Sequence, residues 1–367
     1  MRKYSIVIVT YQMRETLRNT LEALNYMEGF GRDEFEVIVS DDGSMDGTQE
    51  YVQGINRNYE MKYIFTERSQ LSCRNRARNL GIKEAGGEII ICMDGDVLAN
   101  KNLLSEFDRC YSMDSNIVVA GARIMLERNV EYEAVHDQSI FMKHRFDGSN
   151  NESLDDRYRK YNVLSYNSNA MRHPWLMAHT NIVSIPKAYI NKVGLFSEEI
   201  KGWGFDESEL MYRLFKAGVK FIINHKIEVL HQPHNEMRDT PENVKVIEFT
   251  NNISLFFKKY PDALNQLPEN LTDYFMNDQM LELLTPAHAI LRRIELNLKQ
   301  TEELLEIKQV IIKCLNEEGL ELVVYDYIES TDLDIYIQLL GETRSVIKYF
   351  PMSKKLTYST VLDGGEK

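Results

Sequence analysis

The sequence predicts an α/β protein with a mostly parallel β-sheet whose faces are covered by helices. Three observations support this prediction. Short β-branched runs alternate with helical patterns over about the first 235 residues, as strands and crossover helices do in a parallel sheet. The runs are continuously apolar, which is typical of strands buried on both faces. Two acidic clusters, at 41–42 and 94–96, directly follow such runs, and ligands of these sheets bind beyond the carboxyl ends of strands.

Each strand is predicted from a short run of β-branched and apolar residues. The runs occupy residues 5–10, 36–40, 63–65, 88–93, 117–121, 180–185 and 220–230. Helices are predicted where apolar residues recur at helical spacing, as Leu17, Leu21 and Leu24 do. They occupy residues 14–27, 49–55, 71–85, 102–111 and 206–217, with a short helix between Pro186 and Gly194. Residues 123–172 are polar and irregular, and we expect them to form a long surface insertion.

The character of the sequence changes near residue 241, where helical patterns replace the alternation. We therefore predict one domain over residues 1–240 and a mainly helical accessory region over residues 241–367. Within the second region, helices are expected at 244–260, 276–284 and 288–317, and strands at 322–326 and 335–339. We find no catalytic constellation there, so we expect this region to bind a substrate or to mediate homo-oligomerisation.

Composition limits the classes of partner. With 367 residues, 43% of them hydrophobic, the chain can bury one large core or two smaller ones. A net charge of −13 and a pI near 5.2 argue against nucleic acid, whose phosphates would be repelled, although a few local cations still permit a nucleotide ligand. No apolar run approaches the roughly 18–20 residues of a membrane span, and no signal peptide is predicted. The four cysteines form no CxxC pair, which favours reduced thiols and a cytoplasmic protein.

The triplet Asp94-Gly95-Asp96 ends a predicted strand. Two carboxylates one residue apart can ligate a hard divalent cation, directly or through its waters. Gly95 is expected to let the backbone turn sharply at that point. The alternative is a solvated acidic turn, which acidic proteins form readily.

A second acidic pair, Asp41-Asp42, ends the strand at 36–40. A carboxylate in this position can accept the imide N–H of uracil, which distinguishes uracil from cytosine. The following residues, 42–48, are accounted for as a turn and helix cap formed by Asp42-Gly43 and Asp46-Gly47. That explanation leaves Asp41 available for a ligand.

Four blocks in this order resemble the family-2 glycosyltransferases, which have a GT-A fold. They are SIVIVTYQM, VIVSDDGSMDGT, ARNLGIKEAGGEIIICMDGDV and GWGFDESELMYRLFKAGVKF, and together they span about the first 235 residues. The resemblance implies a nucleotide-diphosphate sugar donor, a divalent metal (Mn²⁺ or Mg²⁺) on the DxD triplet and inversion at the anomeric carbon. The implied donor-binding residues are Thr10, Tyr11, Asp41, Asp94 and Gly95, and the implied metal ligands are Asp94 and Asp96.

Three arginines, at positions 74, 76 and 78, stand at the start of the helix predicted after residue 71. Arg74 and Arg78 lie four residues apart on one helix face, and we expect one or both to contact the donor diphosphate. The alternative is a solvated basic face.

The block Gly202-Trp203-Gly204-Phe205-Asp206-Glu207 supplies the candidate general base. In similar enzymes the acidic pair is Glu-Asp, whereas here it is Asp206-Glu207. Inverting transfer requires a carboxylate that removes the acceptor proton as the acceptor attacks. Glu207 is the first candidate by position and Asp206 the second. The alternative role is stabilisation of the following helix N-terminus.

His231 follows the last predicted strand. In many metal-dependent relatives a histidine in this position completes the metal coordination, and imidazole suits manganese. His234 is the fallback ligand, and a surface or core histidine is the alternative interpretation.

These residues predict a glycosyltransferase of the hexosyltransferase type that takes a UDP-sugar donor. The acceptor, whether glycan, lipid-linked glycan, peptide or small metabolite, is not specified by any motif. A sugar nucleotidyltransferase would need a Gly-rich loop after the first strand, and residues 11–19 contain no glycine. A nicotinamide dehydrogenase would need GxGxxG there. A non-catalytic sugar-nucleotide-binding scaffold remains the main alternative.

Overall fold

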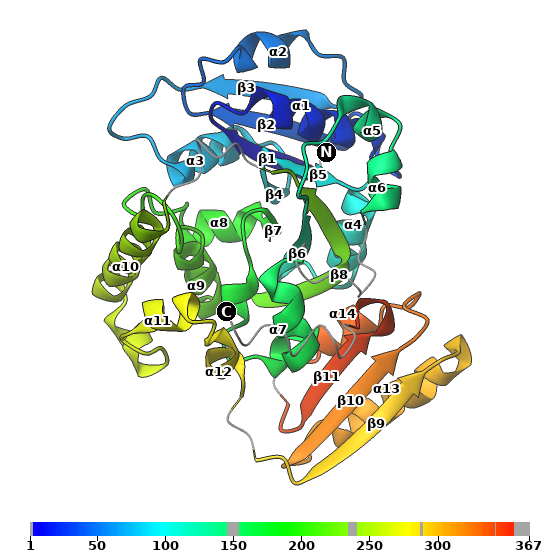
Figure 1. Cartoon of the computed structure of the whole chain (residues 1–367). Coiled ribbons are helices and arrows are strands. Elements are labelled where there is room, and N and C mark those ends of the chain that lie inside the picture. Colours follow the sequence, from blue (N-terminus) through cyan, green and yellow to red (C-terminus); the bar gives the residue numbers. More distant parts are fainter. Residues whose placement is uncertain (1–2, 145–153, 234–240, 287–288, 342, 356–367) are drawn as a thin grey trace.

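The computed structural model describes residues 3–144, 154–233, 241–286, 289–341 and 343–355. An eight-stranded mixed sheet forms its centre, with the strand order β3-β2-β1-β4-β7-β6-β8-β5 (Figure 1). The strands are β1 (Tyr4–Thr10), β2 (Phe35–Asp41), β3 (Glu60–Phe65), β4 (Ile89–Asp94), β5 (Val97–Ala99), β6 (Ile117–Met125), β7 (Ile182–Pro186) and β8 (Lys220–His231). Strands β1 to β4 are mutually parallel where they pair, and β7 runs antiparallel to both of its neighbours. The predicted α/β class and all seven predicted strands are confirmed.

Helices cover both faces of the sheet because alternate strand residues point to opposite sides. On β1, Ile6 and Ile8 join the apolar cluster that contains Leu17 and Leu21, whereas Val7 joins the cluster on the opposite face. The helices of this part are α1 (Arg14–Ala23), α2 (Thr48–Gly54), α3 (Arg74–Glu84), α4 (Leu103–Met113), α5 (Tyr132–His136), α6 (Ser139–Lys143), α7 (Asp156–Leu164), α8 (Lys187–Val193) and α9 (Ser208–Lys216).

The interpretation of residues 123–172 as a surface insertion is wrong for residues 155–172, most of which are buried, whereas residues 127–144 do lie largely at the surface. Strand β6 continues to Met125, and α7 carries side chains that are buried in the core, among them Tyr158 and Tyr161. Arg157 on the same helix is also buried, because Asp155 accepts its Nη2 hydrogen bond at 2.6 Å and Asn181 accepts another at 3.0 Å. A polar sequence therefore conceals an internal ion pair, which composition alone does not reveal.

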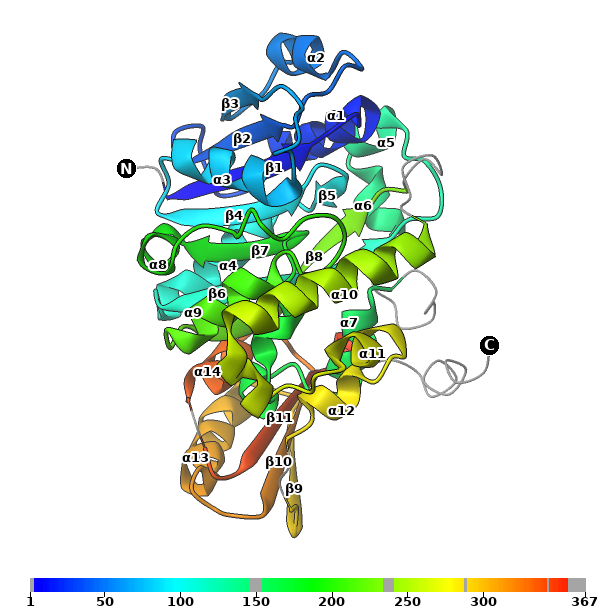
Figure 2. The same cartoon turned by 90° about the vertical axis from the view of Figure 1, so that its left-hand side faces the viewer.

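The chain beyond residue 240 begins with three helices, α10 (Glu242–Lys259), α11 (Leu271–Met276) and α12 (Met280–Leu284). Helix α10 crosses the face of the first part (Figure 2). Its Phe256 ring lies 5.1 Å from that of Phe205 and 6.2 Å from that of Trp175, centroid to centroid. The hydrophobic core thus runs across the predicted boundary at residue 240, and the two-domain division remains a prediction.

Residues 289–355 form a small α/β unit, which we call the C-terminal module. Its parallel sheet has the order β11-β10-β9 and contains β9 (Arg292–Leu298), β10 (Leu320–Asp326) and β11 (Val346–Pro351). Its helices are α13 (Leu304–Cys314) and α14 (Leu333–Leu339). The strand expected at 322–326 is confirmed. The helix expected at 288–317 is wrong in its first half, which forms β9, and the strand expected at 335–339 is a helix.

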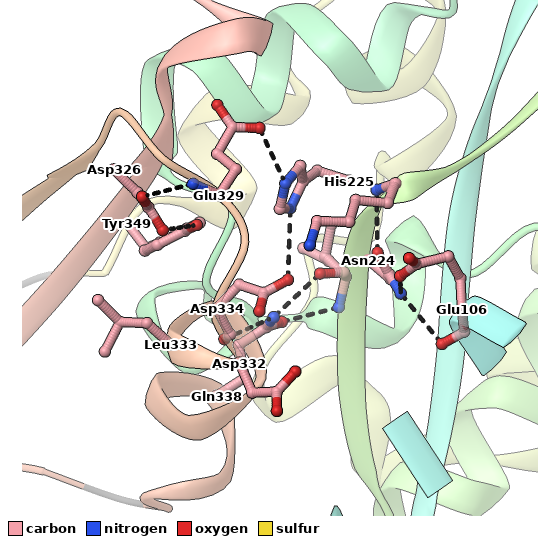
Figure 3. Close-up of polar contacts among 12 residues, drawn as sticks. Glu106, Asn224, His225, Asp326, Glu329, Asp332, Leu333, Asp334, Gln338 and Tyr349 are labelled. Atoms are coloured by element: carbon pink, nitrogen blue, oxygen red, sulfur yellow. Dashed lines mark hydrogen bonds and ion pairs between the residues drawn. The ribbon is translucent and has the colours of Figure 1, made fainter. Parts of the chain in front are cut away.

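The C-terminal module docks on β8 through buried polar contacts (Figure 3). Gln338 accepts the Ile223 backbone N–H at 2.7 Å and donates to its carbonyl at 2.9 Å, so that its amide imitates a neighbouring strand. The buried His225 ring lies between Glu329, 3.3 Å from Nε2, and Asp334, 3.4 Å from Nδ1. Helices still predominate beyond residue 240, but of the three strands in the module's sheet only β10 was predicted.

Within the described residues, no helix is long and apolar enough to cross a lipid bilayer.

Candidate active site

The candidate site is built at the carboxyl ends of three adjacent parallel strands. In the sheet register, Thr10 of β1 lies opposite Asp41 of β2, and Val9 lies opposite Asp94 of β4. Three predicted donor-site residues therefore stand side by side at one sheet edge, although 84 positions separate Thr10 from Asp94 in the chain. Thr10 is buried, and its hydroxyl has no hydrogen-bond partner within the described residues.

Asp41 is buried at the end of β2, where its two carboxylate oxygens accept different bonds. The Ser44 backbone N–H donates to Oδ1 at 2.8 Å, and the Tyr63 hydroxyl donates to Oδ2 at 2.6 Å. A carboxylate has about four acceptor positions, so these two bonds leave capacity for a ligand N–H. The Asp41–Tyr63 bond and burial raise the pKa of the Tyr63 phenol, burial being the larger cause.

The first loop carries an aromatic surface beside this acid. Tyr11 is 39% exposed, and the Arg68 guanidinium lies over its ring, 3.9 Å from the centroid. Arg68 also donates to the Asp42 carboxylate at 2.9 Å. Arg68 was not predicted from the sequence, because only the folded loop brings it to Tyr11. A planar stack of this kind offers a surface for a nucleobase.

Arg78 connects the candidate donor and base residues. Its guanidinium donates to Asp206 at 2.8 Å and lies 3.7 Å from the Asp94 carboxylate, and the side chain is only 4% exposed. Arg74 lies at the more exposed end of the same helix face, where it donates to the Gly202 carbonyl at 2.6 Å and pairs with Asp206 at 3.5 Å. The predicted helix-face pair is thus aimed at the site, but both arginines already contact Asp206.

The two acids of the base block have opposite electrostatic environments. Burial alone would raise the pKa of Asp206, but the charges of Arg74 and Arg78 outweigh it and hold that pKa well below its usual range. Burial and the adjacent Asp206 carboxylate together raise the pKa of Glu207. Asp206 is therefore a poor general base at neutral pH, whereas its raised pKa makes Glu207 the stronger base of the two. Glu207 occupies the N-cap position of α9 without a side-chain capping bond.

Two asparagines of α3 hold the segment that precedes the base. Asn75 donates to the carbonyls of Ser197 and Asp206, both at 2.9 Å. Asn79 donates to the Phe196 carbonyl at 2.9 Å and accepts the Phe196 N–H at 3.0 Å. These residues were not predicted, although their four-residue spacing on the arginine-bearing helix was a usable signal.

Gly95 lies in the tight turn between β4 and β5, as expected, and it is also required for space. Its φ is not positive, so the missing side chain matters here through packing. A Cβ added to Gly95 would lie 2.8 Å from the Met13 sulfur and 2.9 Å from the Val9 carbonyl oxygen. The glycine lets the first loop pack directly on the acidic triplet.

Asp96 and His231 lie close together where β5 pairs with β8. Val97, the residue after Asp96, is the register partner of His231. Both are buried, and His231 Nε2 lies 3.6 Å from Asp96 Oδ1. Two ligand atoms that are each about 2.1 Å from a metal are about 3.0 Å apart at a right angle and about 4.2 Å apart when opposed. A carboxylate and an imidazole at this separation fit a manganese-type ion.

A complete metal cage is not preformed. Among the described residues, no group of three or more His, Cys, Asp or Glu side chains is placed to hold a metal ion. Asp94 instead turns toward Arg78, with its side chain 30% exposed. His234, the fallback ligand, lies outside the described residues.

Residues 5–170 match the model for glycosyl transferase family 2. Over this segment, which is less than half of the chain, the protein resembles that family. It is 28% identical over 287 residues to the uncharacterized glycosyltransferase YfnE of Bacillus subtilis. This match covers 70% of each chain. It is 28% identical over 278 residues to validoxylamine A glucosyltransferase of Streptomyces hygroscopicus and 24% identical over 271 residues to chondroitin synthase of Escherichia coli. These matches span 72% and 70% of this glycosyltransferase, but 62% and 39% of the relatives, less than two thirds of either.

Solved structures confirm the GT-A type architecture of this glycosyltransferase. S. aureus TarS superposes with a TM-score of 0.50 at 18% identity, over 76% of this chain and 43% of TarS. The mannosyltransferase PcManGT of Pyrobaculum calidifontis, whose structure contains GDP-Man and Mn²⁺, superposes with a TM-score of 0.50 at 15% identity, over 77% and 73% of the two chains. At these identities the likeness concerns the fold alone.

Proposed function

We propose that this glycosyltransferase moves a sugar from a UDP-sugar to an acceptor nucleophile, with inversion at the anomeric carbon and with a divalent metal. The contact set of Arg78 carries the proposal. One buried guanidinium contacts both Asp94, on the donor side, and Asp206, next to the candidate base Glu207. These two contacts support the proposal, because in-line displacement requires the donor and the base to lie close together.

On the donor side, Asp41 accepts the uracil N–H, while Tyr11 and the Arg68 stacked on it supply a flat surface for the base. Thr10 and Gly95 border the same loop. Arg74 and Arg78 offset the diphosphate charge. A related observation concerns another protein: a solved structure of S. aureus TarS residues 1–349 contains UDP.

Asp94, Asp96 and His231 are the proposed ligands of a Mn²⁺ or Mg²⁺ ion. A bound divalent ion would withdraw negative charge from the departing diphosphate. Asp96 and His231 are already held at a ligand-to-ligand distance. Asp94, which lies 3.7 Å from Arg78, would supply the third ligand to a bound ion.

Glu207 is the proposed general base. As the acceptor attacks the anomeric carbon, its proton passes to the Glu207 carboxylate, and the bond to the diphosphate breaks on the opposite face of the sugar. The raised pKa of Glu207 brings its basicity toward neutral pH, whereas the arginines keep Asp206 a weak base. A positioned base contributes about 10²–10⁴-fold in rate.

The test is acceptor-dependent release of UDP in the presence of Mn²⁺. We expect Glu207→Gln to lose about 10²-fold or more of this rate while still binding the donor. Glu199→Gln changes an exposed acid in the preceding loop and serves as the matched control. Donor binding without turnover in the unaltered protein would support a non-catalytic scaffold instead. Release of pyrophosphate from UTP and a sugar 1-phosphate would indicate a nucleotidyltransferase.

A further inference from the structure

Residues 201–205 form a strained loop immediately before the acidic pair. Gly202, Gly204 and Phe205 all have positive φ, at 77°, 80° and 59°. A residue other than glycine held in this region is strained, and such strain gathers at functional sites. The local conformation of Phe205 is therefore maintained by the surroundings of the loop.

Helix α10 provides most of those surroundings. Glu248 accepts the Trp203 N–H at 2.7 Å, and Asn252 donates to the carbonyls of Lys201 at 3.0 Å and Gly204 at 2.7 Å. A Cβ on Gly202 would collide with the Glu248 carboxylate, and one on Gly204 with the Phe249 ring. The loop thus lies flat on the helix, and its two glycines permit that close approach.

The result is an indole fixed at the surface. Trp203 is 37% exposed, whereas Trp175, which is the only other tryptophan in the chain, is 1% exposed. The Phe249 ring supports the indole at a centroid distance of 5.8 Å, and the Lys245 ammonium lies 5.8 Å from its centroid. An indole whose only role was to fill the core would be buried, so the exposed area of Trp203 is available to a ligand.

The loop that carries the indole is joined to the acidic pair. Arg74 donates to the Gly202 carbonyl and pairs with Asp206, so one side chain joins the loop to the acidic pair. Glu207 follows Trp203 by four residues, and Asp206 and Arg78 separate the loop from Asp94 and the donor strand ends. This position belongs to the acceptor half of the site.

We propose that Trp203 is a stacking platform for a saccharide ring of the acceptor. One face of a pyranose or cyclitol ring presents C–H groups, which pack on the electron-rich face of an indole. Next to the indole, the Lys245 ammonium can donate to the ring hydroxyls and the Glu248 carboxylate can accept from them. This inference names the acceptor class for the proposed glycosyl transfer and rests on that function.

Binding is tested by tryptophan fluorescence of the full chain with UDP and Mn²⁺ present. The probes are neutral mono- and disaccharides of glucose, galactose and N-acetylglucosamine, compared with glycerol and a serine-containing peptide. We expect at least one saccharide to give a saturable change that is absent in Trp203→Phe, whose remaining tryptophan is the buried Trp175. No saccharide response, a response that survives in Trp203→Phe, or an equal response to glycerol or peptide would overturn the inference.

Kinetics with the responding saccharide separates the inference from the proposed function. Trp203→Ala is expected to raise the acceptor KM by about tenfold, with partial recovery in Trp203→Phe, because a stacked aromatic contact contributes about 1 kcal/mol or more. Acceptor-independent hydrolysis of the UDP-sugar is measured in parallel, so that a defect in the donor site is distinguished from a loss of acceptor binding. Unchanged acceptor KM with intact donor hydrolysis would refute the platform alone, whereas absence of donor hydrolysis and transfer in the unaltered protein would refute the glycosyltransferase proposal.

Discussion

The guanidinium of Arg78 lies 2.8 Å from the Asp206 carboxylate, in a position where neither group is open to solvent. Asp94 stands on its other side at 3.7 Å. Lysine carries the same charge but cannot present two N–H groups in a fixed plane. We therefore expect Arg78→Lys to lower kcat/KM for sugar transfer by roughly 10- to 100-fold, since hydrogen bonds to charged groups contribute about 1.5–3 kcal/mol. Lys83→Arg, at the exposed end of the same helix, is the control, and a twofold effect or less in Arg78→Lys would contradict the bridging role.

The same ion pair sets the expected pH dependence. Glu207 must be deprotonated to act as a base, and burial together with Asp206 raises its pKa, so activity should fall with decreasing pH already above the usual glutamate range near 4.5. Asp206→Asn removes the neighbouring negative charge and leaves the positive charge of Arg78 in place. The pKa of Glu207 should therefore fall. The acidic limb of the kcat/KM profile should then move to lower pH. A limb that stays in place or moves upward would show that Glu207 is not the titrating base.

The proposed metal site predicts a graded dependence on manganese. Excess chelator should abolish UDP release, and added Mn²⁺ should restore it. His231→Ala removes one of the two ligands already held together and should raise the half-saturating Mn²⁺ concentration by about 10- to 100-fold, an effect that is seen even for outer-sphere changes. His136→Ala, which removes a histidine paired with Glu22 on the outside of α5, should leave it unchanged. Equal Mn²⁺ requirements in the two variants would exclude His231 as a ligand.

The strand-end residues of the site were predictable because a parallel sheet aligns what is scattered in sequence. The acids at 41 and 94 follow short buried strands, and the register places them at one edge. Arg68 was not predicted, since its partner Tyr11 lies far away in the chain and only folding joins the two side chains.

The C-terminal module was mispredicted for physical reasons. The residues of β9 favour helix by composition, but pairing with β10 overrides that preference. The next helical segment starts with a capping box between Gln300 and Glu303, a signal that marks the true start of helix. Helix α14 buries residues on every side, including Asp334 and Gln338, so no helical amphipathic pattern is present in its sequence.

Asp41→Asn tests the base contact without removing the local fold. The asparagine oxygen can still accept the Ser44 N–H, and its amide can donate to the Tyr63 oxygen, which reverses the present bond. The amide nevertheless lacks the charged acceptor for uracil. UDP affinity should fall by roughly tenfold or more, measured by calorimetry with Mn²⁺, whereas CDP affinity should not fall. Equal losses for both nucleotides would indicate a structural role for Asp41.

Asp334 is expected to hold the C-terminal module on the sheet. It accepts two hydrogen bonds from Arg109, at 3.0 and 3.1 Å, and lies 3.4 Å from His225. Removing one partner of a buried ion pair lowers the free energy of unfolding by about 3 kcal/mol or more. Asp334→Asn should therefore lower the midpoint of urea unfolding and the hydrogen-exchange protection of β10. Asp332→Asn removes an exposed partner of the same arginine and should cost less than about 1 kcal/mol.

The stability difference between the unaltered protein and Asp334→Asn should depend on pH, which is a further check on the ion pair. Burial opposes ionisation of Asp334, but the bonds from Arg109 and the positive charge available on His225 outweigh it and lower the pKa of this carboxyl. A carboxyl whose pKa is lower in the folded state stabilises above its unfolded pKa, near 3.9, and loses that contribution as the pH falls through the folded value. The stability gap between the unaltered protein and Asp334→Asn should therefore be constant near neutral pH and should narrow below about pH 4. A gap that persists unchanged in acid would show that Asp334 acts through packing and not through its charge.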